Sequence, residues 1–149
     1  MIHFDGEEAF PVPPAELYPK LTDAGFLVHC LPDAEVSAAS PDRAAWKLKP
    51  KLSFLSGALE TELLVTDRVS PVTTRFLIHG KAIGATSTTE AALTFSDAAG
   101  GGTAVRWTAD ITALTGLLKM VPKGLIQATA QKVIADVWAA IRARVAGEG

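Results

Sequence analysis

The sequence of residues 103–145, TAVRWTADITALTGLLKMVPKGLIQATAQKVIADVWAAIRARV, decides the fold, because the spacing of its apolar residues changes part-way along. Up to about residue 112, apolar and polar residues alternate, which is typical of a strand with one buried face. From Pro122 onward, apolar residues recur at steps of three and four, which predicts one long amphipathic helix ending at Gly147. The predicted apolar stripe comprises Leu118, Val121, Leu125, Ile126, Ala130, Val133, Ile134, Val137, Trp138, Ile141 and Val145.

The two-residue alternation extends upstream over most of the chain, to about residue 46. Turn-forming residues such as Ser70-Pro71 and the glycines at 100–102 separate the alternating segments. The pattern therefore predicts a series of antiparallel strands with one apolar face turned toward a core. The residues predicted to face inward include Trp46, Leu48, Pro50, Leu52, Leu63, Val65, Phe76, Ile78, Gly80, Ala91, Leu93, Phe95, Val105, Trp107, Ala109 and Ile111.

The N-terminal segment has a different pattern. Residues 2–12 predict a strand, and Pro14 then suits the first turn of a short helix, Pro14–Leu21, because proline lacks the N–H that would be unpaired there. Asp23 can cap a second short helix that runs to about Cys30. The whole chain, residues 1–149, therefore predicts a single α+β domain. In it, a curved antiparallel sheet wraps around a long C-terminal helix, with two short helices after the first strand, which is the helix-grip arrangement.

Composition and charge exclude several classes of protein. A formal net charge of −2 and a pI near 5.9 argue against a nucleic-acid binder. Cys30 is the only cysteine, which excludes an intrachain disulfide and favours a reducing compartment. No apolar run approaches the ~18 residues of a membrane span, and Met1–Asp5 lacks signal-peptide features. We therefore expect a cytoplasmic protein. Lys47, Lys49 and Lys51 form a basic cluster that could contact anionic lipid or a partner peripherally.

The histidines and the cysteine predict neither a metal site nor a cofactor. His3, His29 and His79 lack the spacing that converging metal ligands need. His29 and Cys30 are adjacent on a helix, so their side chains do not face each other as a base and a nucleophile would. Cys30 is better interpreted as a small core residue.

The carboxylates likewise predict no catalytic residues. Alternation places Glu62, Glu90 and Asp110 on the outer face of the sheet. Glu8 has the same parity as Phe4 and Phe10, but near the sheet edge we expect it to be solvated. General acid–base chemistry needs a carboxylate inside the pocket, and the pattern provides none.

The N-terminal third carries a motif. Phe4, Gly6, Phe10 and Val12 are followed by Pro14, Glu16, Leu17, Leu21, Thr22-Asp23, Leu27 and Cys30-Leu31-Pro32. This order resembles that of the CoxG family of carbon monoxide dehydrogenase subunits, within the START/Bet v 1-like (SRPBCC) superfamily. Asp33 stands where that family has glycine. The resemblance implies a START/Bet v 1-like domain that binds an apolar ligand, or an accessory role beside a molybdenum hydroxylase of the carbon monoxide dehydrogenase type. It brings no catalytic residues.

The resemblance favours a ligand pocket between sheet and helix over a filled core. The expected lining is Trp46, Leu48, Leu63, Val65, Phe76, Ile78, Leu93, Trp107, Ile111, Leu125, Thr129 and Val133. Three hypotheses follow. The first is non-catalytic binding of a lipid or a quinone-like molecule. The second is a cyclase or hydrolase using the same pocket, and the third is a structural or assembly module with a filled core.

Overall fold

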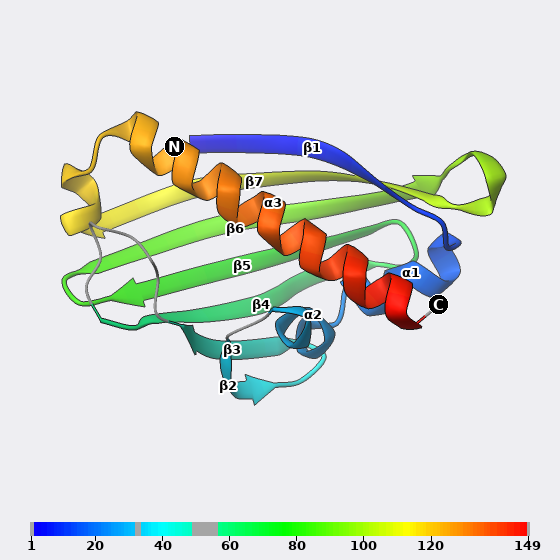
Figure 1. Cartoon of the computed structure of the whole chain (residues 1–149), viewed down its shortest axis with the longest axis horizontal. Helices are drawn as coiled ribbons and strands as arrows, with labels where there is room; N and C mark the ends of the chain where they lie inside the picture. The colour runs from blue at the N-terminus through cyan, green and yellow to red at the C-terminus, as the bar shows by residue number, and fades with distance from the viewer. Residues whose placement is uncertain (1, 32–33, 49–56, 149) are drawn as a thin grey trace.

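The computed structural model describes residues 2–31, 34–48 and 57–148. Within these residues the elements follow the predicted order of one strand, two short helices, further strands and a long final helix (Figure 1). Their bounds are β1 (Ile2–Phe10), α1 (Pro14–Leu21), α2 (Ala24–Cys30), β2 (Glu35–Ala39), β3 (Arg43–Leu48), β4 (Leu59–Val69), β5 (Thr73–Ala82), β6 (Ala85–Asp97), η1 (Ala99–Gly101), β7 (Thr103–Gly116), η2 (Leu117–Met120) and α3 (Lys123–Glu148).

The described strands form one antiparallel sheet in the order β1-β7-β6-β5-β4-β3-β2. The N-terminal strand pairs with the last strand, so that Gly6 lies opposite Trp107. The sheet curves, and α3 crosses its inner face diagonally (Figure 1). The predicted α+β helix-grip fold is confirmed. Predicted inward residues Pro50 and Leu52 lie outside the described residues.

Strand β7 is longer than the alternation indicated. It continues to Gly116 rather than ending near residue 112. The pairing register with β6 shifts between Thr88 and Thr89, which lie opposite Ala113 and Ile111, so one residue of β7 is left over. Such a bulge interrupts the two-residue period. The alternation in the sequence therefore ends near residue 112, although the strand itself continues to Gly116.

The two short helices close one end of the sheet, and their starts have the predicted causes. Pro14 occupies the first turn of α1, and the Asp23 carboxylate accepts a hydrogen bond from the Phe26 N–H at 3.2 Å at the start of α2. The Tyr18 hydroxyl donates to the Thr73 carbonyl at 2.8 Å. This bond ties α1 to the start of β5.

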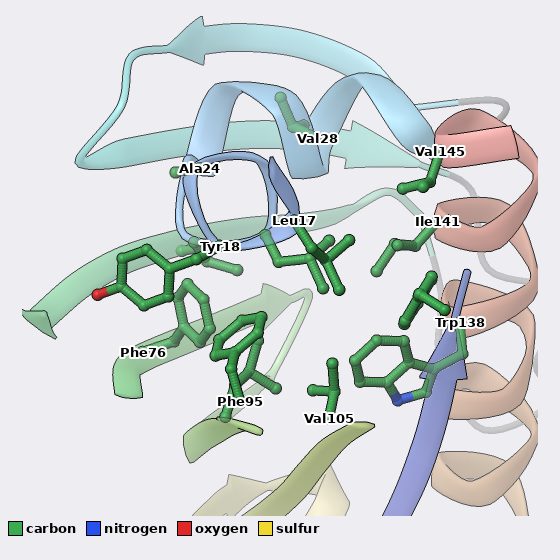
Figure 2. Packing of buried hydrophobic residues seen from close by; sticks show 14 of the residues in the cluster. Leu17, Tyr18, Ala24, Val28, Phe76, Phe95, Val105, Trp138, Ile141 and Val145 are labelled. Atoms are coloured by element: carbon green, nitrogen blue, oxygen red, sulfur yellow. The ribbon is translucent and has the colours of Figure 1, made fainter. Parts of the chain in front are cut away.

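The main core lies at this same end of the molecule. Figure 2 shows Trp138, Ile141 and Val145 of α3 pointing toward Leu17 of α1 and Val105 of β7. A second, smaller cluster surrounds Ile2, Phe4 and Ile126 near the start of α3. Between the two clusters, inward-facing residues of the sheet are only half-buried. The helix therefore covers the sheet unevenly.

Helix α3 uses a narrower face than its apolar residues suggested. The side chains packed against the clusters are Ile126, Ala130, Ile134, Val137, Trp138, Ile141 and Val145. Leu125 and Val133 belong to the predicted stripe but are 45% and 53% exposed. The helix also continues past the predicted stop at Gly147 to Glu148. Gly147 therefore lies within the last turn of α3 and does not end the helix.

Candidate functional site

The predicted pocket residues on the sheet do share its inner face. Trp46, Leu63, Phe76 and Leu93 have the predicted inward parity and are buried in the main core. The others on the sheet are half-buried, namely Leu48, Val65, Ile78, Trp107 and Ile111. The first four are packed side chains, and of the half-buried five Trp107 lines the groove described below.

The predicted contribution of α3 is corrected by the structure. Leu125 and Val133 are exposed, because the face of α3 centred on Ile134 and Ile141 packs against the sheet and turns these two residues away from it. Thr129 is half-buried and belongs to neither core cluster. Other residues of α3, among them Ile134 and Trp138, line the groove described below.

A groove of about 620 Å³ lies between β1 and α3. His3, Phe4, Asp5 and Glu8 line it from β1, Trp107 lines it from β7, and the helix contributes one side. The helix residues that line it are Gln131, Ile134, Ala135, Trp138, Ala139 and Arg142. Its size falls within the range of about 300–1,000 Å³ typical of small-molecule sites. Except for Trp107, the sequence reasoning missed these lining residues, although Phe4 and Glu8 share the inward parity of β1.

Two tryptophans form the apolar floor of this groove. The rings of Trp107 and Trp138 lie 6.3 Å apart at an angle of 37°. The indole of Trp107 lies over Gly6, where a Cβ atom would come within 2.7 Å of the ring. Among the described residues, the Trp107 Nε1–H is buried without a hydrogen-bond partner. The absence of a side chain at Gly6 is what lets the indole occupy this position.

Glu8 is the carboxylate whose predicted environment was wrong. It lies on the groove side of β1, and its carboxylate accepts a hydrogen bond from Arg142 Nη2 of α3 at 2.7 Å. Arg142 also donates to the Ala9 carbonyl at 2.5 Å and lies 4.9 Å from the Phe10 ring centre. The C-terminal half of α3 runs beside the edge strand here and partly covers Glu8, whose side chain is 25% exposed. The pair links α3 to β1 at the end of the groove.

Of the other titratable residues singled out from the sequence, His3 lines the groove, whereas His29, His79, Glu62 and Asp110 do not. Asp110 faces outward and bonds to His3, with Nδ1 and Oδ1 2.6 Å apart. His79 is exposed on the outer face, and His29 is exposed with its Nδ1 bonded to the Gly25 carbonyl at 2.7 Å. Glu62 pairs with Arg43 at 2.6 Å, again on the outer face. The structure does not bring these groups together.

A smaller polar hollow of about 330 Å³ lies on the outer face, across β3, β4 and β5. Lys47 and Lys81 line it with Glu60 between them, and Lys47 approaches Glu60 to 3.9 Å. Opposite charges alternate across the strands, so this face presents no uniform basic surface. Of the predicted basic cluster, Lys49 and Lys51 lie outside the described residues.

Comparison with known families decides where the chain belongs. The sequence pattern of CoxG, the family of carbon monoxide dehydrogenase subunits, matches residues 6–146. The chain belongs to this family. The match spans the closing helix and most of the N-terminal motif, so it includes the helix wall of the groove and Glu8 of β1. None of the curated proteins compared with the chain matches it.

This CoxG family member shares its fold with several solved structures, among them a START superfamily protein. A conserved protein from Geobacillus kaustophilus superposes with a TM-score of 0.83 at 17% identity, over 98% of this chain and 96% of that one. A START superfamily protein from Mycobacterium smegmatis gives 0.70 at 9% identity, over 99% of both chains. The Aha1 dimer protein from Colwellia psychrerythraea gives 0.61 at 16%, over 95% of this chain and 94% of that one. At these identities the likeness is one of fold.

Proposed function

We propose that this CoxG family member binds an apolar small molecule, of lipid or quinone type, between the inner face of the sheet and α3. The observation that carries the proposal is the groove of about 620 Å³, which the half-buried apolar side chains of Trp107 and Ile134 help to line. Its walls combine the aromatic rings of Phe4, Trp107 and Trp138 with a few polar groups, which is the usual composition of a small-molecule site. The binding is non-catalytic.

Family membership supports the second part of the proposal, an accessory role beside a molybdenum hydroxylase of the carbon monoxide dehydrogenase type. In this role the chain would hold the ligand for the hydroxylase and perform no chemistry on it. A tagged chain should then co-purify with the hydroxylase from its own cells. A hydroxylase complex that assembles and turns over normally without this chain would contradict the accessory role.

The environment of Glu8 keeps one rival open, a cyclase or hydrolase using the same groove. An enzyme needs titratable groups that reach the ligand, and Glu8 lines the groove. The Glu8 carboxylate already accepts a hydrogen bond from Arg142. To act as a general base, Glu8 would have to give up this hydrogen bond. Ligand recovered chemically unchanged after incubation with the wild-type protein favours the carrier over the enzyme.

The first test is direct identification of the ligand. The protein is purified under native conditions and extracted with organic solvent, and the extract is analysed by mass spectrometry. We expect a lipid or quinone in a constant ratio to protein. Because Trp107 and Trp138 line the groove, a quinone added to the emptied protein should also quench tryptophan fluorescence.

A pair of variants on α3 links binding to the groove. Ala139→Trp places a large ring in the groove and should weaken ligand uptake at least about tenfold, which corresponds to about 1.4 kcal/mol. Ala128→Trp is the control, since Ala128 is exposed on the same helix and does not line the groove. Equal uptake by both variants would place the ligand elsewhere. A protein that neither carries nor takes up any lipophile would leave the third hypothesis, an assembly module with a filled core.

A further inference from the structure

The groove beside β1 includes a free edge of the sheet. Among the described strands, β1 pairs with β7 alone, and Figure 1 shows it as the outermost strand on its side. Three consecutive residues, His3, Phe4 and Asp5, line the groove, although neighbouring side chains in a strand point to opposite faces. Consecutive residues share one surface when that surface includes the backbone edge between the two faces. The β1 wall of the groove therefore contains the edge of the strand.

The direction of two carbonyls shows which backbone groups of β1 point to this edge. The Ala9 carbonyl accepts a hydrogen bond from Arg142 of α3, so it points away from β7. The Phe10 carbonyl lies against Gly102, directly before the first residue of β7. In an antiparallel pair the N–H and C=O of one residue point to the same side, and this side alternates along the strand. The odd-numbered residues of β1 therefore direct their backbone groups to the free edge.

This alternation leaves three residues with open backbone groups beside the groove. His3, Asp5 and Glu7 have the same parity as Ala9, and among the described residues they form no backbone hydrogen bond outside the strand pairing. Their N–H and C=O groups recur at about 7 Å, since two residues of a strand span this distance. An extended chain presents its own groups at the same spacing. Arg142 occupies the edge at Ala9, so the open ladder ends there.

The surfaces on the inner side of this edge are apolar. The Trp107 indole lies over Gly6 and so reaches the outermost strand. Helix α3, like every other helix in the described part of the chain, is not long and apolar enough to cross a membrane. Its face toward the groove carries Ala135 and Ala139, whose small side chains leave room. A strand added beside β1 would place its inward side chains in these surroundings, which favours apolar residues.

The outer side of the same edge is acidic. The side chains of Asp5 and Glu7 are 67% and 57% exposed, although each has one cationic neighbour, His3 and Arg106 respectively. Opposite charges on adjacent strands attract, and like charges placed directly opposite are destabilising. Two copies of β1 paired with each other would bring these carboxylates together. The edge is therefore complementary to a strand with lysine or arginine at its outward positions, and not to a second copy of this chain.

We propose that the free edge of β1 binds an extended peptide segment of a partner protein, which adds one strand to the sheet. Its apolar side chains turn into the groove, and its basic side chains lie beside Asp5 and Glu7. In this mode of recognition, main-chain hydrogen bonds supply affinity and the alternating side chains supply specificity. The inference goes beyond the proposed ligand binding. Lipophile uptake is measured separately, so that either proposal can fail alone.

The test is a titration of the purified full chain with the peptide acetyl-Leu-Lys-Leu-Lys-Leu-amide, followed by amide hydrogen exchange in NMR spectra. Exchange at the amides of His3, Asp5 and Glu7 should slow at least about tenfold, because the added strand protects them. The amides of Phe4 and Gly6 should not change, because they already point toward β7. This alternation in one strand is an internal control.

Two methylated peptides test the main-chain hydrogen bonds. One carries N-methyl groups on its lysine amides and the other on its leucine amides, so their side chains are identical. In an added strand only one of these two sets of N–H groups faces β1. One peptide should therefore bind at least about tenfold more weakly than the parent, and the other should bind as the parent does. Equal binding by both, or loss of binding by both, would contradict strand addition.

A charge reversal tests the acidic side of the edge. The peptide acetyl-Leu-Glu-Leu-Glu-Leu-amide should bind about tenfold more weakly than the lysine peptide. Asp5→Lys should reduce this preference. Asp97→Lys is the matched control, since Asp97 is exposed at the end of β6 and does not line the groove. Circular dichroism shows whether each variant folds, and the comparison of peptides on the wild type needs no variant.

Two further outcomes would overturn the proposal. The first is a wild-type protein whose spectra show no saturable change with the lysine peptide at millimolar concentration. The second is binding that leaves exchange at Asp5 and Glu7 unchanged, which would place the peptide away from the edge of β1. A protein that takes up a lipophile and yields either result retains the proposed ligand binding and loses only the peptide site.

Discussion

At the scale of single residues, the position of the Trp107 ring depends on the residue at position 6, because the ring packs directly on Gly6. The sequence shows an ordinary glycine in a strand and an ordinary inward tryptophan, and only their pairing across β1 and β7 brings the ring over the glycine. A rigid indole cannot move aside as a flexible side chain would. The position of Trp107, and with it one wall of the groove, therefore depends on the absence of a side chain at Gly6.

A double-mutant cycle measures this dependence. Gly6→Ala should destabilise the wild type by about 1–3 kcal/mol, the usual cost of overpacking. Trp107→Ala should cost about 3–5 kcal/mol, as for a packed tryptophan. In the Trp107→Ala background, Gly6→Ala should cost almost nothing because the ring is gone. Urea unfolding of the four proteins gives the free energies, and additive costs would contradict the contact.

His3 is the residue whose titration the fold changes. Its hydrogen bond to Asp110, and then the one to Asp5, raise the pKa of the imidazole above its ordinary value. The fold therefore favours the charged form of the His3 imidazole. The resulting contribution to the stability of the folded protein is complete below the unfolded-state pKa of about 6.5, and it is lost as pH rises through the higher folded-state pKa.

Proton NMR of the His3 ring measures this pKa. Asp110→Asn should lower it, and Asp136→Asn, which changes a distant carboxylate on α3, should leave it unchanged. A pKa of His3 that is the same in the wild type and in Asp110→Asn would show that the hydrogen bond does not form in solution.

At the scale of elements, the rotation of α3 decides which apolar residues are buried. The apolar stripe predicted for α3 is wider than the helix face that contacts the sheet. The sequence alone does not show which edge of the stripe is buried and which is exposed. Contact with α2 near Val28 and with β1 through Arg142 fixes the helix in one rotation. Val133 then falls outside the buried face and Ile141 inside it.

Two truncations on α3 test this rotation. Ile141 is 4% exposed, so Ile141→Ala should destabilise the protein by about 2–5 kcal/mol. Val133 is 53% exposed, so Val133→Ala should change stability by less than about 0.5 kcal/mol. The midpoints of urea unfolding for the two variants, compared at an unchanged m-value, measure the two losses of stability. Similar losses for both variants would mean that α3 presents a different face to the sheet.

At the scale of the whole molecule, packing is concentrated at one end. Helices α1 and α2 and the C-terminal half of α3 enclose the main core there, as Figure 2 shows for Tyr18, Phe76 and Phe95. Toward the other end the inner face of the sheet is half-buried, and beyond it Ile83, Leu117 and Met120 are exposed. The groove lies where these two regions meet, since Trp138 of the main core and Phe4 of the second cluster both line it.

The sequence by itself determined the class of the fold. A change of period from two to three-and-four near residue 112 is a local property, and so are Pro14 and Asp23 at the starts of the two short helices. Alternation also determined the inward parity of each strand, because neighbouring side chains in a strand must point to opposite faces. The family motif, which residues 6–146 carry, was likewise visible in the sequence.

Only the tertiary structure decided the site. The groove needs β1 placed beside α3, two elements at opposite ends of the chain, and no local pattern encodes that contact. The same placement turned Glu8 from a solvated edge residue into the partner of Arg142. The exposure of Ile83 and Met120 was likewise visible only in the structure, because isoleucine and methionine are typical core residues and no described part of the chain covers these two. Periodicity determines which face of an element is apolar, and packing alone determines which part of that face is covered.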